Sequence, residues 1–103
     1  MILVNTEGIS EKKLEMLGIV KGSTVQSRNV GKDIMSGLKT LVGGEITAYA
    51  DMLDKARALA TKRMVAEAEA LNADGVVNIR YASSSVMQGS AEVMVYGTAV
   101  KFL

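Results

Sequence analysis

The side chains that most often carry chemistry in proteins are missing from this chain, because it has no cysteine and no histidine. Nucleophilic catalysis of the common kinds needs a Cys nucleophile or a His base, and zinc, copper and nickel sites usually recruit the same two residue types. Asp and Glu remain, and their oxygens suit hard ions such as Ca²⁺. A symmetric ring of copies could bring one carboxylate from each copy together, so a carboxylate metal site is one hypothesis. The identity of any metal stays open, and the sequence requires no cofactor.

Two short motifs could support other chemistry, and for both the structural interpretation is favoured. The run Ser83 to Ser85 is the obvious cluster for a Ser-Lys mechanism, but serines favour turns, so it predicts a polar hairpin tip. The run Gly43-Gly44-Glu45 precedes a predicted helix, whose N-terminus could bind an anion. It matches neither the Walker A pattern nor G-x-G-x-x-G, and Glu45 would repel an anion while complementing the helix dipole. We identify no catalytic residue and expect no enzyme.

The most informative pair is Arg63 and Glu67, which are spaced i, i+4 on the apolar face of a predicted long helix. A charge pair on a buried face is costly unless both members find partners. Three interpretations stay open: an intrahelical salt bridge at the margin of that face, a bridge between subunits, and the lining of a small-molecule pocket. Structural ion pairs outnumber functional ones, which favours the first. The candidate ligand-binding residues are Arg28, Glu45, Tyr49, Arg63 and Glu67.

Apolar periodicity predicts an amphipathic helix over residues 45–71, the strongest signal in the sequence. Its predicted buried face consists of Tyr49, Met52, Leu53, Ala56, Leu59, Ala60, Met64 and Leu71. Its opposite face carries Asp51, Lys55, Lys62 and Glu69. We expect Asn72 to end the helix in the left-handed conformation, a role that Gly fills more often.

Shorter elements are predicted on both sides of this helix. Before it we expect strands at 1–5 and 19–30, a helix at 11–17 that Ser10 caps and Gly18 ends, and a helix at 32–42. After it we expect strands at 76–81 and 91–103, joined by a hairpin tip at 83–90. This order predicts one α+β domain over residues 1–103, with a two-layer architecture in which an antiparallel sheet carries the long helix on one face.

The last predicted strand is apolar on both sides. Val93, Val95 and Ala99 point one way, whereas Met94, Tyr96, Val100 and Phe102 point the other. One helix covers only one sheet face, and an exposed apolar face favours association. We therefore expect a homo-oligomer, and the alternative is that the short helix at 11–17 covers the second face.

Charge and composition exclude other classes of partner. The net charge is +1, and aromatic residues make up 4% of the chain, so the sequence has neither the basic footprint nor the stacking platforms of nucleic-acid binders. No apolar run approaches a membrane span, and no signal peptide is visible at the N-terminus. Since small secreted domains are usually stapled by disulfides, we expect a cytoplasmic location.

Three runs of the sequence resemble the YbjQ-like family of small bacterial and archaeal proteins, which carries a heavy-metal-binding label. They are Val42 to Arg57 (VGGEITAYADMLDKAR), Glu67 to Tyr81 (EAEALNADGVVNIRY) and Met87 to Phe102 (MQGSAEVMVYGTAVKF). The resemblance implies a dodecin-subunit-like fold with a β-α-β-β core, and a ring-shaped homopentamer. It supplies no catalytic residues. Two positions depart from the family pattern, since Glu45 stands where members often carry Arg, and Asn72 where they often carry Gly.

These observations lead to one functional expectation with two alternatives. We expect a non-enzymatic homo-oligomeric module, pentameric by the resemblance, that binds a small ligand or a partner protein at its subunit junctions. The first alternative is a metal-binding or metal-responsive protein that uses carboxylates, and the second is an enzyme of unknown reaction.

Overall fold

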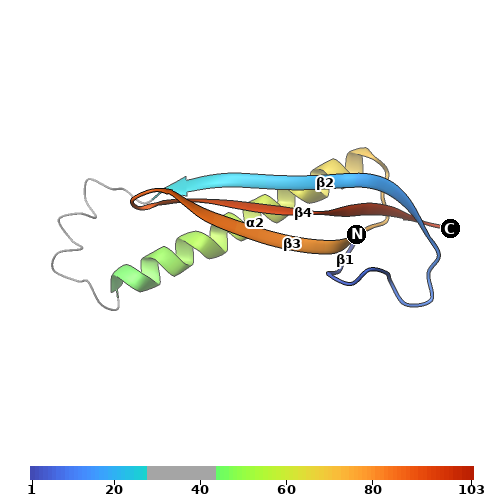
Figure 1. Ribbon diagram of the computed structural model, residues 1–103, viewed down its shortest axis with the longest axis horizontal. Helices are drawn as coiled ribbons and strands as arrows, with labels where there is room; N and C mark the ends of the chain where they lie inside the picture. The colour runs from blue at the N-terminus through green and yellow to red at the C-terminus, as the bar shows by residue number, and fades with distance from the viewer. Residues whose placement is uncertain (28–43) are drawn as a thin grey trace.

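The computed structural model describes residues 1–27 and 44–103, which form one helix packed on one four-stranded sheet (Figure 1). The elements in chain order are β1 (Ile2–Leu3), β2 (Leu14–Ser27), α2 (Gly44–Ala70), β3 (Gly75–Met87) and β4 (Ser90–Phe102). The order of strands in the sheet is β1-β3-β4-β2. No helix within the described ranges is long and apolar enough to cross a membrane.

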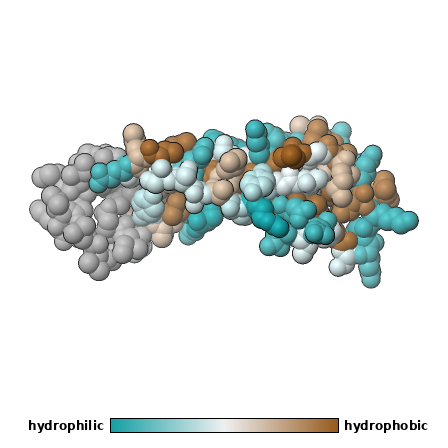
Figure 2. Space-filling view, viewed as in Figure 1, coloured by the Kyte–Doolittle hydropathy of each residue, from teal (hydrophilic) through white to brown (hydrophobic). Residues whose placement is uncertain are grey.

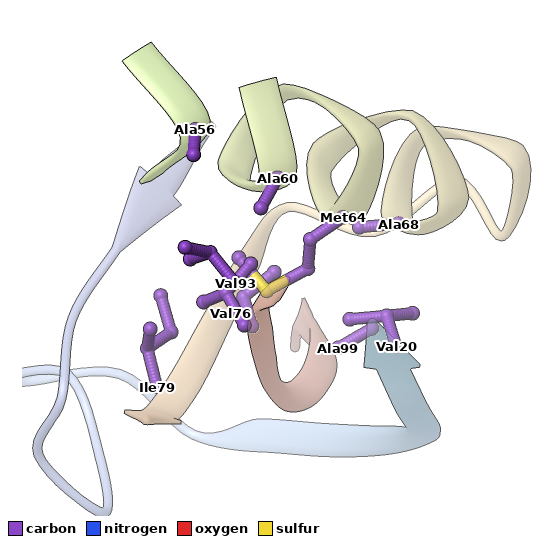
Figure 3. Packing of buried hydrophobic residues seen from close by; sticks show 10 residues of the cluster. Val20, Ala56, Ala60, Met64, Ala68, Val76, Ile79, Val93 and Ala99 are labelled. Atoms are coloured by element: carbon purple, nitrogen blue, oxygen red, sulfur yellow. The ribbon is translucent and has the colours of Figure 1, made fainter. Parts of the chain in front are cut away.

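The long helix predicted over residues 45–71 is confirmed as α2, one residue displaced at each end. Its buried stripe has a spacing of four residues and consists of Ala56, Ala60, Met64 and Ala68. Figure 3 shows these side chains pointing at Val76, Val93 and Ala99 of the sheet. Because three of the four are alanines, the helix can lie close to the strands. The four charged residues predicted on the opposite face are all exposed.

The predicted buried face of α2 is wrong at its C-terminal end. Leu71 follows the last helical residue and is 44% exposed, whereas Ala68, which the prediction omitted, is fully buried. The predicted end of the helix is confirmed, because Asn72 has a φ of 58°. This left-handed residue lets the chain turn back into β3.

β4 occupies the middle of the sheet, with β3 on one side and β2 on the other, both antiparallel to it. Val93, Val95 and Ala99 belong to the cluster under α2, and the alternation of a strand directs Met94, Tyr96 and Val100 to the opposite face. The predicted division of the β4 side chains is confirmed, and its central position explains why both sides are apolar.

The helix predicted at 11–17 is wrong, because β2 already begins at Leu14. The apolar residues Leu14 and Leu17 fit a helical spacing over this short window, but a β-bulge produces the same spacing in a strand. The ladder of β2 with β4 shifts register between Met16 and Gly18, and Gly18 has a φ of 134°. Gly18 therefore belongs to a bulge and ends no helix.

Two other predicted elements need correction or fall outside the description. The hairpin tip predicted at 83–90 is wrong, because β3 continues to Met87 and only Gln88 and Gly89 separate it from β4. Gly89 has a φ of 78°, which suits a tight turn. The helix predicted at 32–42 lies outside the described residues, as does the end of the strand predicted at 19–30.

The predicted α+β class and the β-α-β-β order of the core are confirmed by β2, α2, β3 and β4. The sheet is mixed, not fully antiparallel, because β1 pairs with β3 in parallel at Ile2 and Leu3. The short strand β1 is held at the outer side of β3 by further backbone bonds, in which the amide of Asn78 donates to Thr6 and that of Ile79 to Val4.

Candidate functional site: the open face and the β2 edge

The sheet face opposite α2, which we call the open face, is covered at one end by the N-terminal segment. Val77 and Val100 on this face are 1% and 0% exposed. The segment before β2 supplies the cover: the amide of Leu103 donates to the Lys13 carbonyl at 3.0 Å, and Lys12 Nζ lies 5.0 Å from the centre of the Phe102 ring. A segment of bends and one turn therefore lies at this end of the sheet, where the sequence predicted a short helix.

Away from this end, residues 1–27 and 44–103 provide the open face with no such cover. Ile19, Val25 and Tyr96 are 79%, 59% and 41% exposed, and the ladder places Ile19 opposite Thr98 and Val25 opposite Glu92. In Figure 2, apolar side chains in brown alternate with polar ones along the molecule. Large apolar residues gathered on one face mark an interaction surface more often than single ones do.

The helix lies very close to the sheet at Gly22, near the middle of the edge strand β2. A Cβ added at Gly22 would collide with the carbonyl of Ala60 and lie 2.5 Å from the amide nitrogen of Met64, both in the backbone of α2. Glycine is therefore required here for the approach of the helix, not for its backbone angles. α2 therefore lies over the edge strand β2 as well as over the central strand β4.

Arg63 and Glu67 use this close approach to reach the backbone of β2. Nη1 of Arg63 donates to the carbonyl oxygen of Ser23 at 2.6 Å, and the amide of Lys21 donates to Oε1 of Glu67 at 3.0 Å. We call these two side chains and their two bonds the edge clasp. The described residues contain no salt bridge between Arg63 and Glu67; their partners are backbone groups on the neighbouring strand.

The other predicted site residues do not join the edge clasp. Tyr49 is half-buried on the same helix, fourteen positions before Arg63 in the sequence, which corresponds to about 21 Å along the helix axis. Arg28 and the side chain of Glu45 lie outside the described part of the chain. The structure thus brings together two of the five candidates and separates a third from them.

The partners of the edge clasp could not be predicted from the sequence, because the Lys21 amide and the Ser23 carbonyl are backbone groups that almost every residue type carries. One signal was available: Gly22 interrupts a strand rich in Val, Ser and Thr, and glycine inside a strand often marks a close backbone approach. Reasoning also missed Tyr81, whose hydroxyl lies 2.8 Å from Thr61 Oγ1 and ties β3 to α2.

A shallow, open depression of about 430 Å³ lies near the C-terminal end of α2. Its polar lining includes Glu69, Asn72, Asp74 and Lys101. Nζ of Lys101 donates to the Asn72 carbonyl at 2.9 Å and lies 3.9 Å from Oδ1 of Asp74, so its charge already has partners. Lys101 and Asp74 therefore form a structural ion pair in this depression.

The donor set does not fit a heavy-metal site. The sequence supplies neither Cys nor His, and the described residues include no group of three or more Asp and Glu that could hold an ion. Heavy metals prefer the thiolate and imidazole ligands that are missing. A hard-ion site assembled from carboxylates of several copies stays a prediction.

These features define the class as a small α+β protein with a β-α-β-β core, one sheet face under a helix and the other open in its middle. The chain belongs to the YbjQ-like family, because the family model described as “Putative heavy-metal-binding” matches residues 1–103.

Two relatives show how fully the resemblance extends over the chain. A UPF0145 protein of Alkaliphilus metalliredigens is 71% identical over 103 residues, with 100% of both chains covered. A UPF0145 protein of Methanosarcina acetivorans is 51% identical, with 100% of this chain and 98% of the relative covered.

The fold has a counterpart among solved structures. The crystal structure of a protein of unknown function of the DUF74 family from Pediococcus pentosaceus superimposes with a TM-score of 0.67 and covers 100% of this chain and 98% of the other. At 17% identity this likeness shows the fold alone.

Proposed function

We propose that this chain is a non-enzymatic subunit that associates with copies of itself through the open face and binds a small ligand or a partner protein at the resulting junctions. The observation that carries the proposal is the exposure of Ile19, Val25 and Tyr96 on that face. The family resemblance favours five copies in a ring, and the absence of cysteine favours the cytoplasm.

The physical reason for association is the burial of apolar surface. The buried core of the described residues contains no aromatic side chain and is built largely of Val and Ala, so each side chain buries little area on folding. Covering a well-exposed isoleucine contributes about 1.5–3 kcal/mol. The open face therefore provides stability that a single copy leaves unused.

The test is a charge placed in the middle of the open face, in the variant Ile19→Glu. Ile19 is 79% exposed in the single chain, so the substitution leaves the subunit folded while an assembled face would have to bury a carboxylate. We expect subunit affinity to fall by at least tenfold, since about 1.4 kcal/mol corresponds to a factor of ten. Native mass spectrometry and light scattering at micromolar concentration measure the change.

The matched control is Leu71→Glu, which introduces the same charge at another apolar side chain that is 44% exposed but lies at the end of α2. We expect it to assemble as the parent does. A parent protein that is monomeric at micromolar concentration, or an Ile19→Glu variant that assembles as the parent does, would contradict the proposal.

A further inference from the structure

The two edges of the sheet differ, and the difference lies in the edge clasp. Among the described strands, β2 pairs with β4 alone and so forms one edge of the sheet. In an antiparallel ladder, successive residues direct their backbone groups alternately toward the partner strand and away from it. The Lys21 amide and the Ser23 carbonyl, two residues apart, both point away from β4, and Glu67 and Arg63 bind them.

Unpaired edge groups allow another strand to be added to a sheet, which leads to edge-to-edge aggregation. A strand added to β2 would have to bind the outward amide and carbonyl groups of every second residue along β2. The clasp occupies two of these groups at the centre of β2, beside Gly22. Both bonds are charge-assisted, which makes them stronger than the neutral bonds that would replace them.

We propose that Arg63 and Glu67 block the addition of a strand from a second copy to β2 and so determine which surface the copies use. The use of the open face by the copies rests on the self-association proposed above. The blocking of the β2 edge depends on the clasp alone. In this role the two residues are specificity determinants, and the i, i+4 spacing matches the distance between alternate groups of the strand.

The main variant is the double substitution Arg63→Ala with Glu67→Ala. Its matched control is Lys62→Ala with Glu69→Ala, which removes one positive and one negative charge from exposed positions of the same helix. We expect the main variant to form species larger than the parent assembly, with an onset at a protein concentration at least tenfold lower. The control should behave as the parent does. Light scattering and thioflavin fluorescence measure both.

A second substitution separates a blocked edge from simple loss of stability. Ser23→Pro, added to the main variant, removes an outward amide without removing a ladder bond, and proline is tolerated at such edge positions. If edge pairing produces the large species, the triple variant should return to the size distribution of the parent. Large species that persist in the triple variant would show unfolding as their cause and would overturn the proposal.

Single variants at Glu67 keep the test decisive if the double variant does not fold. Glu67→Gln retains a neutral acceptor oxygen and should lie between the parent and Glu67→Ala, whereas Glu67→Ala should speed hydrogen exchange of the Lys21 amide most and lower the onset concentration furthest. Equal exchange and equal onset in both would overturn the blocked edge. If the parent protein is itself monomeric, the open-face proposal fails, but the comparison of main variant and control still decides the role of the clasp.

Discussion

Replacing Gly22 by alanine should strongly destabilise the protein, because both nearest obstacles are backbone atoms of α2. The added Cβ would collide with the Ala60 carbonyl and lie 2.5 Å from the Met64 nitrogen, whereas ordinary contact begins at 3.4 Å. No side-chain rotation relieves this clash, so helix and strand must separate by about 1 Å. A gap of that size forfeits roughly a quarter to a half of the dispersion energy of the contacting atoms.

The magnitude follows from the cost of overpacking, which is about 1–3 kcal/mol and sometimes more. With two backbone obstacles we expect the upper end, about 3 kcal/mol. For a domain of this size that loss lowers Tm by roughly 12 °C or more. Thermal and urea unfolding followed by circular dichroism measure it, at one fixed protein concentration because assembly makes Tm concentration-dependent.

The control for this experiment is Gly8→Ala, since nothing lies within 4 Å of a Cβ added at Gly8. Restricting the unfolded chain should make this variant neutral or up to about 1 kcal/mol more stable. A Gly22→Ala variant that melts within about 3 °C of the parent protein would refute the close packing of α2 on β2, and with it the geometry of the edge clasp.

Two further substitutions test the close approach of β4 to β3 and the end of α2. Gly97→Ala should cost about 2 kcal/mol, because the new Cβ would lie 2.7 Å from Val76 Cγ1 and 2.9 Å from the Val77 carbonyl; urea unfolding measures this, and a loss under about 0.5 kcal/mol would contradict it. Asn72→Val should cost roughly 1–2 kcal/mol, because Asn72 has a φ of 58°, whereas Asn72→Gly should be close to neutral. Equal melting temperatures for the two Asn72 variants would show that the left-handed residue contributes nothing.

The long helix could be predicted from sequence because its evidence is local. Ala56, Ala60 and Met64 repeat at the helical period, and Asn72 marks the end with a residue type that tolerates the left-handed conformation. Each of these signals depends on residues within a few positions of one another. The structure accordingly displaces the predicted ends of the helix by only one residue.

The β-strands were less predictable because their partners are distant in the sequence. Leu14 pairs with Phe102 across most of the chain, and no window around residues 11–17 contains that information. The serines at 83–85 were assigned to a turn by their own preference, yet pairing with Val93, Glu92 and Ala91 holds them in β3. Tertiary pairing thus overrode local propensity at both places.

The edge clasp shows the same limit for functional residues. The prediction that Arg63 and Glu67 lie on the buried face of the helix is wrong, because both residues are exposed beside the stripe, although each has a partner on β2. The sequence could not identify those partners as the Lys21 amide and the Ser23 carbonyl. Every residue but proline has an amide and every residue a carbonyl, so only the path of α2 over β2 selects these two.

The path of α2 also bears on which parts of the sheet are exposed in a single copy. The helix lies over β2 and β4 and leaves residues 80–88 exposed, although β3 and β4 extend to a two-residue turn at Gln88 and Gly89. A hairpin needs packing against other elements to be stable in water. At that end of the sheet α2 packs on β4 through Val93 and Val95, and it contacts β3 through the hydrogen bond between Thr61 and Tyr81. Within residues 1–27 and 44–103, the outer half of the hairpin and part of the open face therefore lack cover. A neighbouring copy on the open face, as proposed above, would lie against both.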